Sequence, residues 1–179
     1  LSYIIAVEEL ARIDGSTAAT IAADNSLGIS PIKEYGTKEQ KEKYLPRLCK
    51  THLWGFGLTE ENAGCDSRGT QSTARMEGDN WILNGSKIFI TNSATPMTLG
   101  STIQVITGEN NGKPEFTTFL IENDTPGFTQ EAMDRKMMWR ASNTGRLTFD
   151  KVRLPKENML GTLGQGSHIM LATLDGGRL

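Results

Sequence analysis

The feature that most constrains the fold is a change of hydrophobic period near Trp54. Before this residue, apolar side chains recur at the spacing that places them on one face of a helix. After it, apolar and polar residues alternate every two positions, which is typical of strands. Helical spacing returns from Gly164. The chain therefore predicts helices first, then a β module, and then the beginning of another helix.

The helical half is expected to consist of several packed helices. Asp14-Gly15-Ser16 separates a first helix, residues 1–13, from an Ala/Thr-rich helix that runs to Asn25. The apolar face of the first helix is expected at Ile4, Ile5, Val7, Leu10 and Ala11. This half is interpreted as a scaffold without chemistry of its own.

Capping signals place the boundaries of two further helices. Ser30-Pro31 is expected to be a cap followed by proline at the first helical position. Thr37-x-x-Gln40 predicts a capping box at the start of a Lys/Glu-rich helix, which Pro46 is expected to stop or kink.

The β module is predicted from short strands separated by turn sequences. Residues 74–77 and 81–83 are expected to form a hairpin around Gly78-Asp79-Asn80, and Asn84-Gly85 is expected to be a second tight turn into a third strand. The remaining strands are expected at residues 102–107, 116–122 after a turn at 110–112, 128–132, and 146–149 with 152–154. Strands at such short spacing favour a small barrel or sandwich over βαβ units.

Composition and charge exclude several classes of protein. A net charge of −2 without a long basic run offers no nucleic-acid surface, and no apolar run approaches the ~20 residues of a membrane span. Cys49 and Cys65 are too few for a disulfide framework, and no secretory leader precedes them, which fits a reducing compartment.

Known site motifs are likewise missing from the sequence. There is no dinucleotide-binding G-x-G-x-x-G and no P-loop, which disfavours a nicotinamide cofactor. His52 and His168 have no partners at zinc-ligand spacing, and the acids near Glu60 lack the spacing of a calcium loop. We therefore expect no metal site.

The loop of residues 55–67, GFGLTEENAGCDS, leaves two interpretations open on its residues alone. The small residues around Gly64 would let the backbone approach a planar or anionic ligand closely. The other interpretation is an ordinary strand exit, in which Glu60 and Glu61 are solvated and Cys65 is an inert turn residue.

Three separated blocks resemble the acyl-CoA dehydrogenase family, in the order in which the family has them. They are FGLTEENAGCD at residues 56–66, WILNGSKIFITN at 81–92, and RASNT at 140–144 leading to VRLPKENMLG at 152–161. YGTKEQK, KYLP and LDGGR are also similar to the family, so that the resemblance covers essentially the whole chain. The short-chain or butyryl-CoA type is the most similar.

The resemblance implies an α+β fold that is truncated at both ends. Residues 1–53 would belong to an N-terminal helical domain, residues 54–160 to a central antiparallel β-barrel domain, and residues 161–179 to the first helix of a C-terminal helical bundle.

The resemblance also implies the cofactor FAD and the α,β-dehydrogenation of an acyl-CoA thioester. Backbone N–H groups of the strand before Glu60 and the Thr59 hydroxyl would bind the flavin edge and stabilise negative charge in the reduced ring. The second block would cover the other side of the ring, and the turn at Gly64 would pass the FAD pyrophosphate and the acyl-CoA. The implied cofactor-binding residues are Phe56, Gly57, Leu58, Thr59, Gly64, Cys65, Phe89, Ile90 and Thr91.

The implied substrate-binding residues are Cys65, Asp175 and Arg178, with Arg178 helping to hold the CoA part. The catalytic base of the short-chain type is a Glu beyond Leu179, so no residue is assigned a catalytic role and the chain alone is expected to be inactive. Two departures concern the site: the family commonly has Trp at Phe89 and Ser at Cys65, and a thiol is a weaker hydrogen-bond partner than a hydroxyl.

The resemblance implies partners and alternatives as well. The parent protein would pass electrons to an electron-transferring flavoprotein, form a homotetramer, and reside in a bacterial cytoplasm or a mitochondrial matrix. The alternatives are an acyl-CoA oxidase, which passes electrons to oxygen, and a module that binds flavin or acyl-CoA without chemistry.

Overall fold

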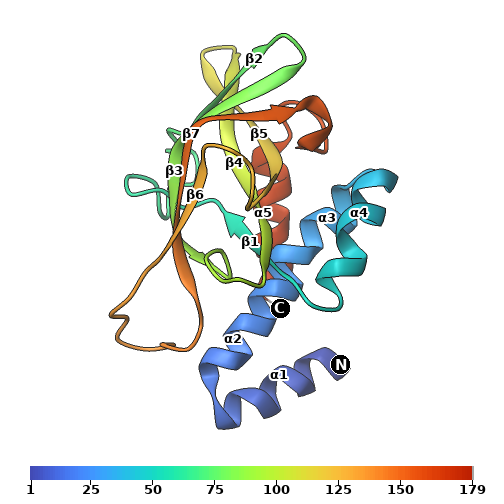
Figure 1. Cartoon of the computed structure of the whole chain (residues 1–179), viewed down its shortest axis with the longest axis vertical. Helices are drawn as coiled ribbons and strands as arrows, with labels where there is room; N and C mark the ends of the chain where they lie inside the picture. Colours follow the sequence, from blue (N-terminus) through green and yellow to red (C-terminus); the bar gives the residue numbers. More distant parts are fainter. Residues whose placement is uncertain (179) are drawn as a thin grey trace.

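The first layer of the molecule is helical, as seen in a computed structural model that describes residues 1–178 (Figure 1). Its elements are α1 (Ser2–Ile13), α2 (Gly15–Ala23), the π-helix η1 (Asp24–Ile29), α3 (Ser30–Tyr35) and α4 (Lys38–Leu48). Asp14 separates α1 from α2 as predicted, because its carboxylate accepts hydrogen bonds from the Ser16 and Thr17 N–H groups and so caps α2.

The expected cap at Ser30 is wrong. Ser30 has α-helical backbone angles and its side chain makes no capping hydrogen bond, so the chain stays helical from α2 through η1 into α3. The proline that follows is tolerated at the first turn of α3, directly after the wider π-turn.

The capping box of α4 is confirmed. The Gln40 N–H donates to Thr37 Oγ1 at 3.2 Å, and the Thr37 N–H donates back to Gln40 Oε1 at 3.0 Å. Pro46 does not stop this helix, which continues to Leu48.

The remaining elements form one sheet and a final helix. They are β1 (Leu53–Gly57), β2 (Thr73–Glu77), β3 (Asn80–Thr91), β4 (Thr98–Asn110), β5 (Lys113–Glu122), β6 (Phe128–Ala132), β7 (Thr144–Pro155), the 3-10 turn η2 (Lys156–Asn158), β8 (Met159–Leu160) and α5 (Gly166–Gly177). The last residue of the expected C-terminal segment, Leu179, lies outside the described residues, and the bundle itself is not observed in residues 1–178.

The hairpin of β2 and β3 is confirmed, but the second tight turn is wrong. Asn84-Gly85 lies inside β3 opposite a bulge of β7, because residues 150 and 151 of β7 both lie against Asn84 between the pairs Leu83–Val152 and Gly85–Phe149. Gly85 has φ 136°, and a Cβ there would lie 2.6 Å from Ser72 Cβ. Strand β3 continues past this point, and Asn84 Oδ1 accepts a hydrogen bond from the Lys151 N–H on the bulge of β7.

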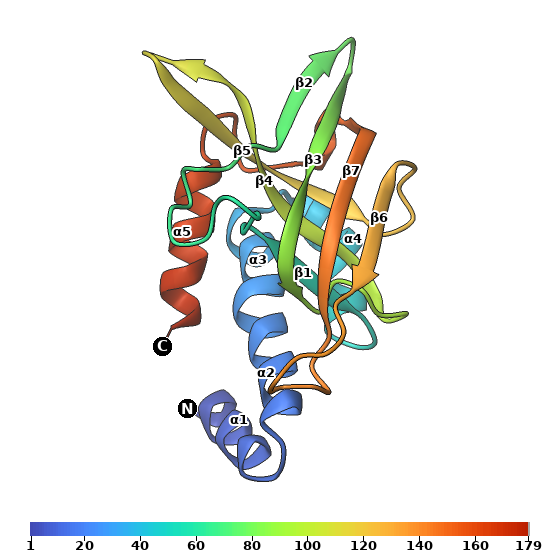
Figure 2. The same ribbon diagram turned by 90° about the vertical axis from the view of Figure 1, so that its left-hand side faces the viewer.

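The sheet is open, so the expected barrel is not supported. Neighbouring strands follow the order β6-β7-β3-β2-β4-β5-β8, and closure would require the first and last of these to pair. Instead β1 pairs in parallel with the start of β4, on the same edge where β2 pairs with β4 through Thr73 alone. The sheet therefore branches at β4 and its end strands β6 and β8 stay unpaired with each other, while the sheet bends around its core (Figure 2).

Two apolar clusters hold the layers together. Inside the bend, Trp81 packs edge-to-face on Phe119, and Phe128 stacks on Phe149. Between the sheet and the helices, a second cluster gathers around the fully buried Trp54 and Ile169 of α5. Helix α5 thus lies against β5, η1 and α3, and joins the two layers (Figure 2).

The first helix was expected to pack its apolar face against the protein, and this expectation is wrong. Helix α1 contacts α2 but buries no side chain, and Ile4 and Ile5 are 48% and 49% exposed. Among residues 1–178, no helix combines the length and the apolar character needed to cross a membrane.

Candidate functional site

A cavity of about 230 Å³ lies where the ends of β1 and β3 meet helices α2, η1 and α5. Its walls are mainly apolar and include three aromatic rings. The lining residues are Ala23, Leu27, Trp54, Phe56, Leu58, Thr59, Gly64, Phe89, Ile90, Thr91 and Leu174. None of these described residues has an ionisable side chain, so the cavity suits a flat, largely apolar group.

The structure brings most of the predicted cofactor residues to this one cavity, from segments that are far apart in sequence. Those that line it are Phe56, Leu58, Thr59, Gly64, Phe89, Ile90 and Thr91. Gly57 does not line it, because it faces the core, where the Lys87 side chain would lie 3.4 Å from an added Cβ. Cys65 is exposed and does not line it either.

Hydrogen-bond donors face the cavity without partners among the described residues. Thr59 is half-buried, and neither its N–H nor its hydroxyl bonds to another residue of 1–178; its carbonyl accepts from the Ile88 N–H at 2.9 Å. The half-buried Thr91 hydroxyl is likewise unbonded within these residues. The polar rim therefore offers donors to a ligand.

Phe89 lies on a bulge of β3. The register against β7 shifts between Lys87 and Ile90, and Phe89 has φ 62°, an uncommon conformation for an aromatic residue. Phe89 is 61% exposed at the mouth of the cavity, whereas its neighbours Ile88 and Ile90 are buried. The bulge is what turns the ring toward the cavity.

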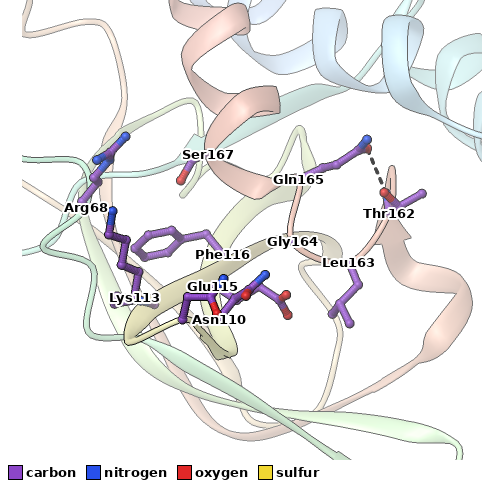
Figure 3. Close-up of a pocket in the computed structure, with 12 residues that line it drawn as sticks. Arg68, Asn110, Lys113, Glu115, Phe116, Thr162, Leu163, Gly164, Gln165 and Ser167 are labelled. Carbon is purple, nitrogen blue, oxygen red and sulfur yellow. Dashed lines mark hydrogen bonds between the residues drawn. The ribbon is translucent and has the colours of Figure 1, made fainter.

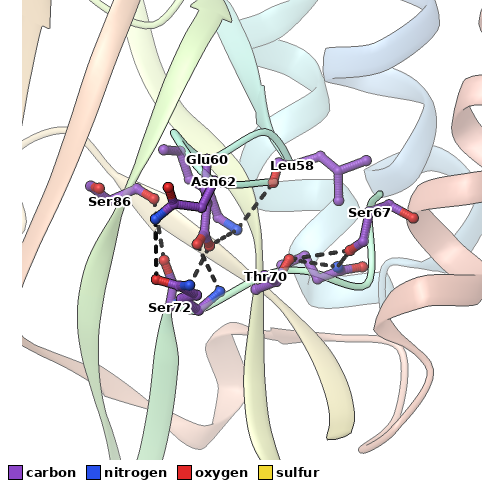
Figure 4. Close-up of polar contacts among 10 residues, drawn as sticks. Leu58, Glu60, Asn62, Ser67, Thr70, Ser72 and Ser86 are labelled. Atoms are coloured by element: carbon purple, nitrogen blue, oxygen red, sulfur yellow. Dashed lines mark hydrogen bonds and ion pairs between the residues drawn. The ribbon is translucent and has the colours of Figure 1, made fainter. Parts of the chain in front are cut away.

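A buried ion pair supports the floor of the site (Figure 4). Lys87 is fully buried, and its Nζ lies 2.7 Å from Glu60 Oε1 and 3.2 Å from the Leu58 carbonyl oxygen. Burial lowers the pKa of Lys87 to about 8, although the negative charge of Glu60 acts to raise it. Burial alone would raise the pKa of Glu60, but the Lys87 charge and hydrogen bonds lower it overall, so both groups are charged at neutral pH.

The same carboxylate organises the loop after β1. Glu60 accepts hydrogen bonds from the Gln71 N–H at 2.7 Å and the Ser72 N–H at 3.1 Å. The Gln104 amide donates to the Ser67 carbonyl and to Thr70 Oγ1 further along the loop (Figure 4). The interpretation of Glu60 as a solvated bystander is therefore wrong. Its neighbour Glu61 is exposed and pairs with Arg146 at 2.5 Å.

A larger and more polar cavity, of about 1100 Å³, lies beside the tip of the β4–β5 hairpin (Figure 3). It is bounded by that hairpin, by the turn before α5 and by Arg68. Its lining includes two cationic side chains, Arg68 and Lys113, and the carboxylate of Glu115. Gly64 lines the small cavity and Arg68 the large one, so a single loop separates the two.

The predicted substrate residues of α5 are not brought into either cavity. Arg178 Nη1 lies 3.0 Å from Asp175 Oδ1, and both side chains are exposed. Leu174 on the same helix does line the small cavity. Within residues 1–178, no cluster of three His, Cys, Asp or Glu side chains could hold a metal ion.

Some residues of the site were not found from sequence. Ala23, Leu27, Trp54 and Leu174 reach the cavity through the packing of helices on the sheet, and no local pattern marks them. Lys87 could have been found from sequence. The alternation of Trp81, Leu83 and Gly85 places it on the inner face of β3, and a cation buried there needs an anionic partner.

Two family descriptions match the chain. "Acyl-CoA dehydrogenase, middle domain" matches residues 55–152, and "Acyl-CoA dehydrogenase, N-terminal domain" matches residues 1–52.

Individual relatives agree with this match. The chain is 46% identical over 180 residues to a short-chain specific acyl-CoA dehydrogenase of Clostridium acetobutylicum, covering 100% of this chain and 47% of the relative. The structure of butyryl-CoA dehydrogenase from Megasphaera elsdenii superposes with a TM-score of 0.92 at 46% identity, covering 99% of this chain and 46% of that one. Glutaryl-CoA dehydrogenase from Mycobacterium smegmatis in complex with FADH2 gives a TM-score of 0.82 at 36% identity, covering 90% and 40%. The chain thus spans about half the length of the curated relatives it matches.

Proposed function

Because this chain belongs to the acyl-CoA dehydrogenase family, we propose that the whole protein is an FAD-dependent dehydrogenase of short-chain acyl-CoA thioesters. The observation that carries the proposal is the small cavity, where aromatic walls and unpartnered donors from β1 and β3 meet. Its chemistry would be the removal of two hydrogens from adjacent carbons of the acyl chain.

The residues around the cavity fit an isoalloxazine ring. Trp54, Phe56 and Phe89 supply apolar walls for a flat ring, and the free donors of Thr59 and Thr91 suit its polar edge. When bound, the flavin supplies the hydride-accepting centre of the reaction. The protein contributes the positioning, because hydride transfer requires the two reactants to be held in contact and in a fixed orientation.

Each residue of the predicted site receives a proposed role. The Thr59 N–H and hydroxyl hold the polar edge of the flavin, together with the backbone from Phe56 to Leu58. Phe89, Ile90 and Thr91 cover the ring from the β3 side, with the Thr91 hydroxyl as a donor. Gly64 and Cys65 pass the FAD pyrophosphate and the acyl thioester, where the absence of a side chain at Gly64 permits close approach.

The substrate is proposed to span both cavities. Its acyl group would enter the small cavity, and its anionic nucleotide part would reach Arg68 and Lys113 in the large one. Asp175 and Arg178, at the end of α5, would hold the CoA part from the helical side. No carboxylate of residues 1–178 lines the small cavity, so the base that removes the α proton is proposed to lie outside these residues.

The architecture and partners of the whole protein complete the proposal. Residues 1–53 would form part of an N-terminal helical domain, residues 54–160 the middle domain, and residues 161–179 the first helix of a C-terminal bundle. We propose a homotetramer that passes electrons to an electron-transferring flavoprotein, in a bacterial cytoplasm or a mitochondrial matrix.

Anaerobic addition of butyryl-CoA to the full-length protein loaded with FAD tests the proposal. The absorbance of the oxidised flavin should fall on mixing. An absorbance that stays constant with every saturated acyl-CoA, despite bound flavin and thioester, would favour the non-catalytic binding module. Stoichiometric peroxide release in air, without need of a flavoprotein acceptor, would favour the oxidase.

A further inference from the structure

Lys87 is a charged side chain in an unusual place. It is 0% exposed in the interior of the sheet, and the proposed chemistry assigns it no role. A buried lysine is costly unless it is paired, and an apolar residue at this position of β3 would fill the same space. The contacts of its ammonium group are therefore informative.

The ammonium group bonds to the backbone of the proposed flavin strand. Lys87 Nζ donates to the Leu58 carbonyl oxygen at 3.2 Å, and Glu60 holds it there at 2.7 Å (Figure 4). That carbonyl belongs to the same peptide unit as the Thr59 N–H. In a trans peptide the C=O and N–H groups point in opposite directions, and the described chain has no cis peptide bond.

The geometry points to Lys87 as a positioning residue that acts on the flavin through the Leu58–Thr59 peptide, an inference that rests on the proposed function. With the Leu58 oxygen turned toward the buried ammonium, the Thr59 N–H is turned toward the small cavity, where it has no partner among the described residues. A cation on the carbonyl also polarises the peptide, which makes its N–H a stronger donor.

The rest of the network keeps the peptide in this orientation. The Thr59 carbonyl accepts from the Ile88 N–H at 2.9 Å, next to Lys87 on β3. Glu60 is held in turn by the Gln71 and Ser72 N–H groups. The ion pair thus ties β3 to the strand exit, on the side of the peptide away from the cavity.

The consequence concerns the reduction potential of bound flavin. Reduction adds negative charge to the ring, so a strengthened donor at its edge favours the reduced over the oxidised form. A residue that only supports the loop would change FAD affinity without changing this preference.

The double substitution Lys87→Met with Glu60→Gln tests the inference in the full-length protein. Methionine replaces the apolar stem of Lys87, glutamine can still accept from one of the two loop N–H groups that Glu60 binds, and no buried charge is left unpaired. The relative affinity for reduced over oxidised flavin should fall about tenfold, which lowers the two-electron potential by about 30 mV. Glu61→Gln is the matched control, since it removes an exposed carboxylate from the same loop and should leave the potential unchanged.

A potential that stays at the wild-type value, whether or not FAD binds more weakly, overturns the inference. If the wild-type protein binds no FAD, the proposed function fails. The NMR signal of the Thr59 amide proton in the ligand-free protein then tests separately whether Lys87 acts on this peptide. This resonance should shift upfield in the double variant and not in Glu61→Gln. An unchanged resonance would mean that Lys87 does not act on this peptide.

Discussion

At the scale of single residues, burial changes what an ionisable side chain does. Glu60 and Glu61 are adjacent, yet one is buried against Lys87 and the other is exposed beside Arg146. Their sequence contains no sign of the difference, because it depends on which strand lies across the loop. The same holds for Asp24, a buried carboxylate whose hydrogen bond from the Trp54 N–H links η1 to β1.

Asp24 should give the protein a measurable pH dependence. Burial raises the pKa of Asp24 to about 6, although the bond from Trp54 opposes this. The folded state therefore binds the Asp24 proton more tightly than the unfolded chain does, and protonation of Asp24 stabilises the fold. This stabilisation is fully present below about pH 4 and is lost as pH rises through 6. Asp24→Asn should remove this loss and stabilise the protein at pH 8 by at most about 3 kcal/mol.

Urea unfolding at pH 4.5, 6 and 8 measures the effect. Asp14→Asn is the control, because the Thr17 hydroxyl and neighbouring N–H groups lower the pKa of this exposed carboxyl. The stabilisation from Asp14 has the opposite sign and is lost only below about pH 4, so Asp14→Asn should leave the pH dependence between pH 4.5 and 8 unchanged. Parallel curves for wild type and Asp24→Asn would contradict the prediction.

Phe89 should matter for binding and little for folding. Its ring is mostly exposed and its backbone is in a disfavoured region, so Phe89→Ala should change the free energy of unfolding without FAD by less than about 1 kcal/mol. Loss of the ring should weaken FAD binding about three- to tenfold, the range of an aromatic contact. Fluorescence titration with FAD measures this loss of affinity. Phe89→Trp is the control variant and should retain the affinity. A large loss of stability in Phe89→Ala would instead show that the ring supports the fold.

At the scale of elements, β3 shows where local patterns succeed and where they fail. The hairpin with β2 follows from turn chemistry over a few residues and was predicted. The bulge of β7 opposite Asn84 and the bulge of β3 at Phe89 were not, because a register shift is set by how the two strands pair. The second bulge breaks the alternation, so that Lys87 and Ile90 both face inward and Phe89 reaches the cavity.

Gly85→Ala should destabilise the protein by about 1–3 kcal/mol. The position has φ 136°, and an added Cβ would meet Ser72, so the backbone at residues 72 and 85 would have to move apart. Gly78→Ala is the matched control, with φ 61° but open space around its Cβ, and should cost about 1 kcal/mol. Thermal and urea unfolding measure both variants, and equal losses would show that crowding at Ser72 contributes nothing.

At the scale of the whole molecule, the loop after β1 lines both cavities, the small one at Gly64 and the large one at Arg68. This arrangement predicts that the cations of the large cavity act on the nucleotide part of the substrate and not on its acyl part. Arg68→Gln with Lys113→Gln should weaken binding of butyryl-CoA to the full-length protein roughly five- to tenfold at low salt, with a smaller effect at high salt.

Butyryl-pantetheine, which lacks the nucleotide, is the control ligand and should bind the variant and the wild type equally. Arg153→Gln, on the outer face of the sheet, is the control variant. Equal loss of affinity for both thioesters would place the two cations at the acyl group and contradict the assignment.

The sequence by itself determined the order of helices, strands and final helix, the capping box of α4, the β2–β3 hairpin, and the family through three motif blocks. These depend on interactions within a few residues or on the motifs themselves. Only the tertiary structure decided that the sheet stays open, that Asn84-Gly85 stays inside β3 opposite a bulge of β7, and that Lys87 and Glu60 meet in the interior. It also brought seven of the predicted cofactor residues around one cavity while leaving Gly57 and Cys65 outside it. The physical reason is that strand register, burial and cavity shape arise from contacts between segments distant in sequence, which no local pattern encodes.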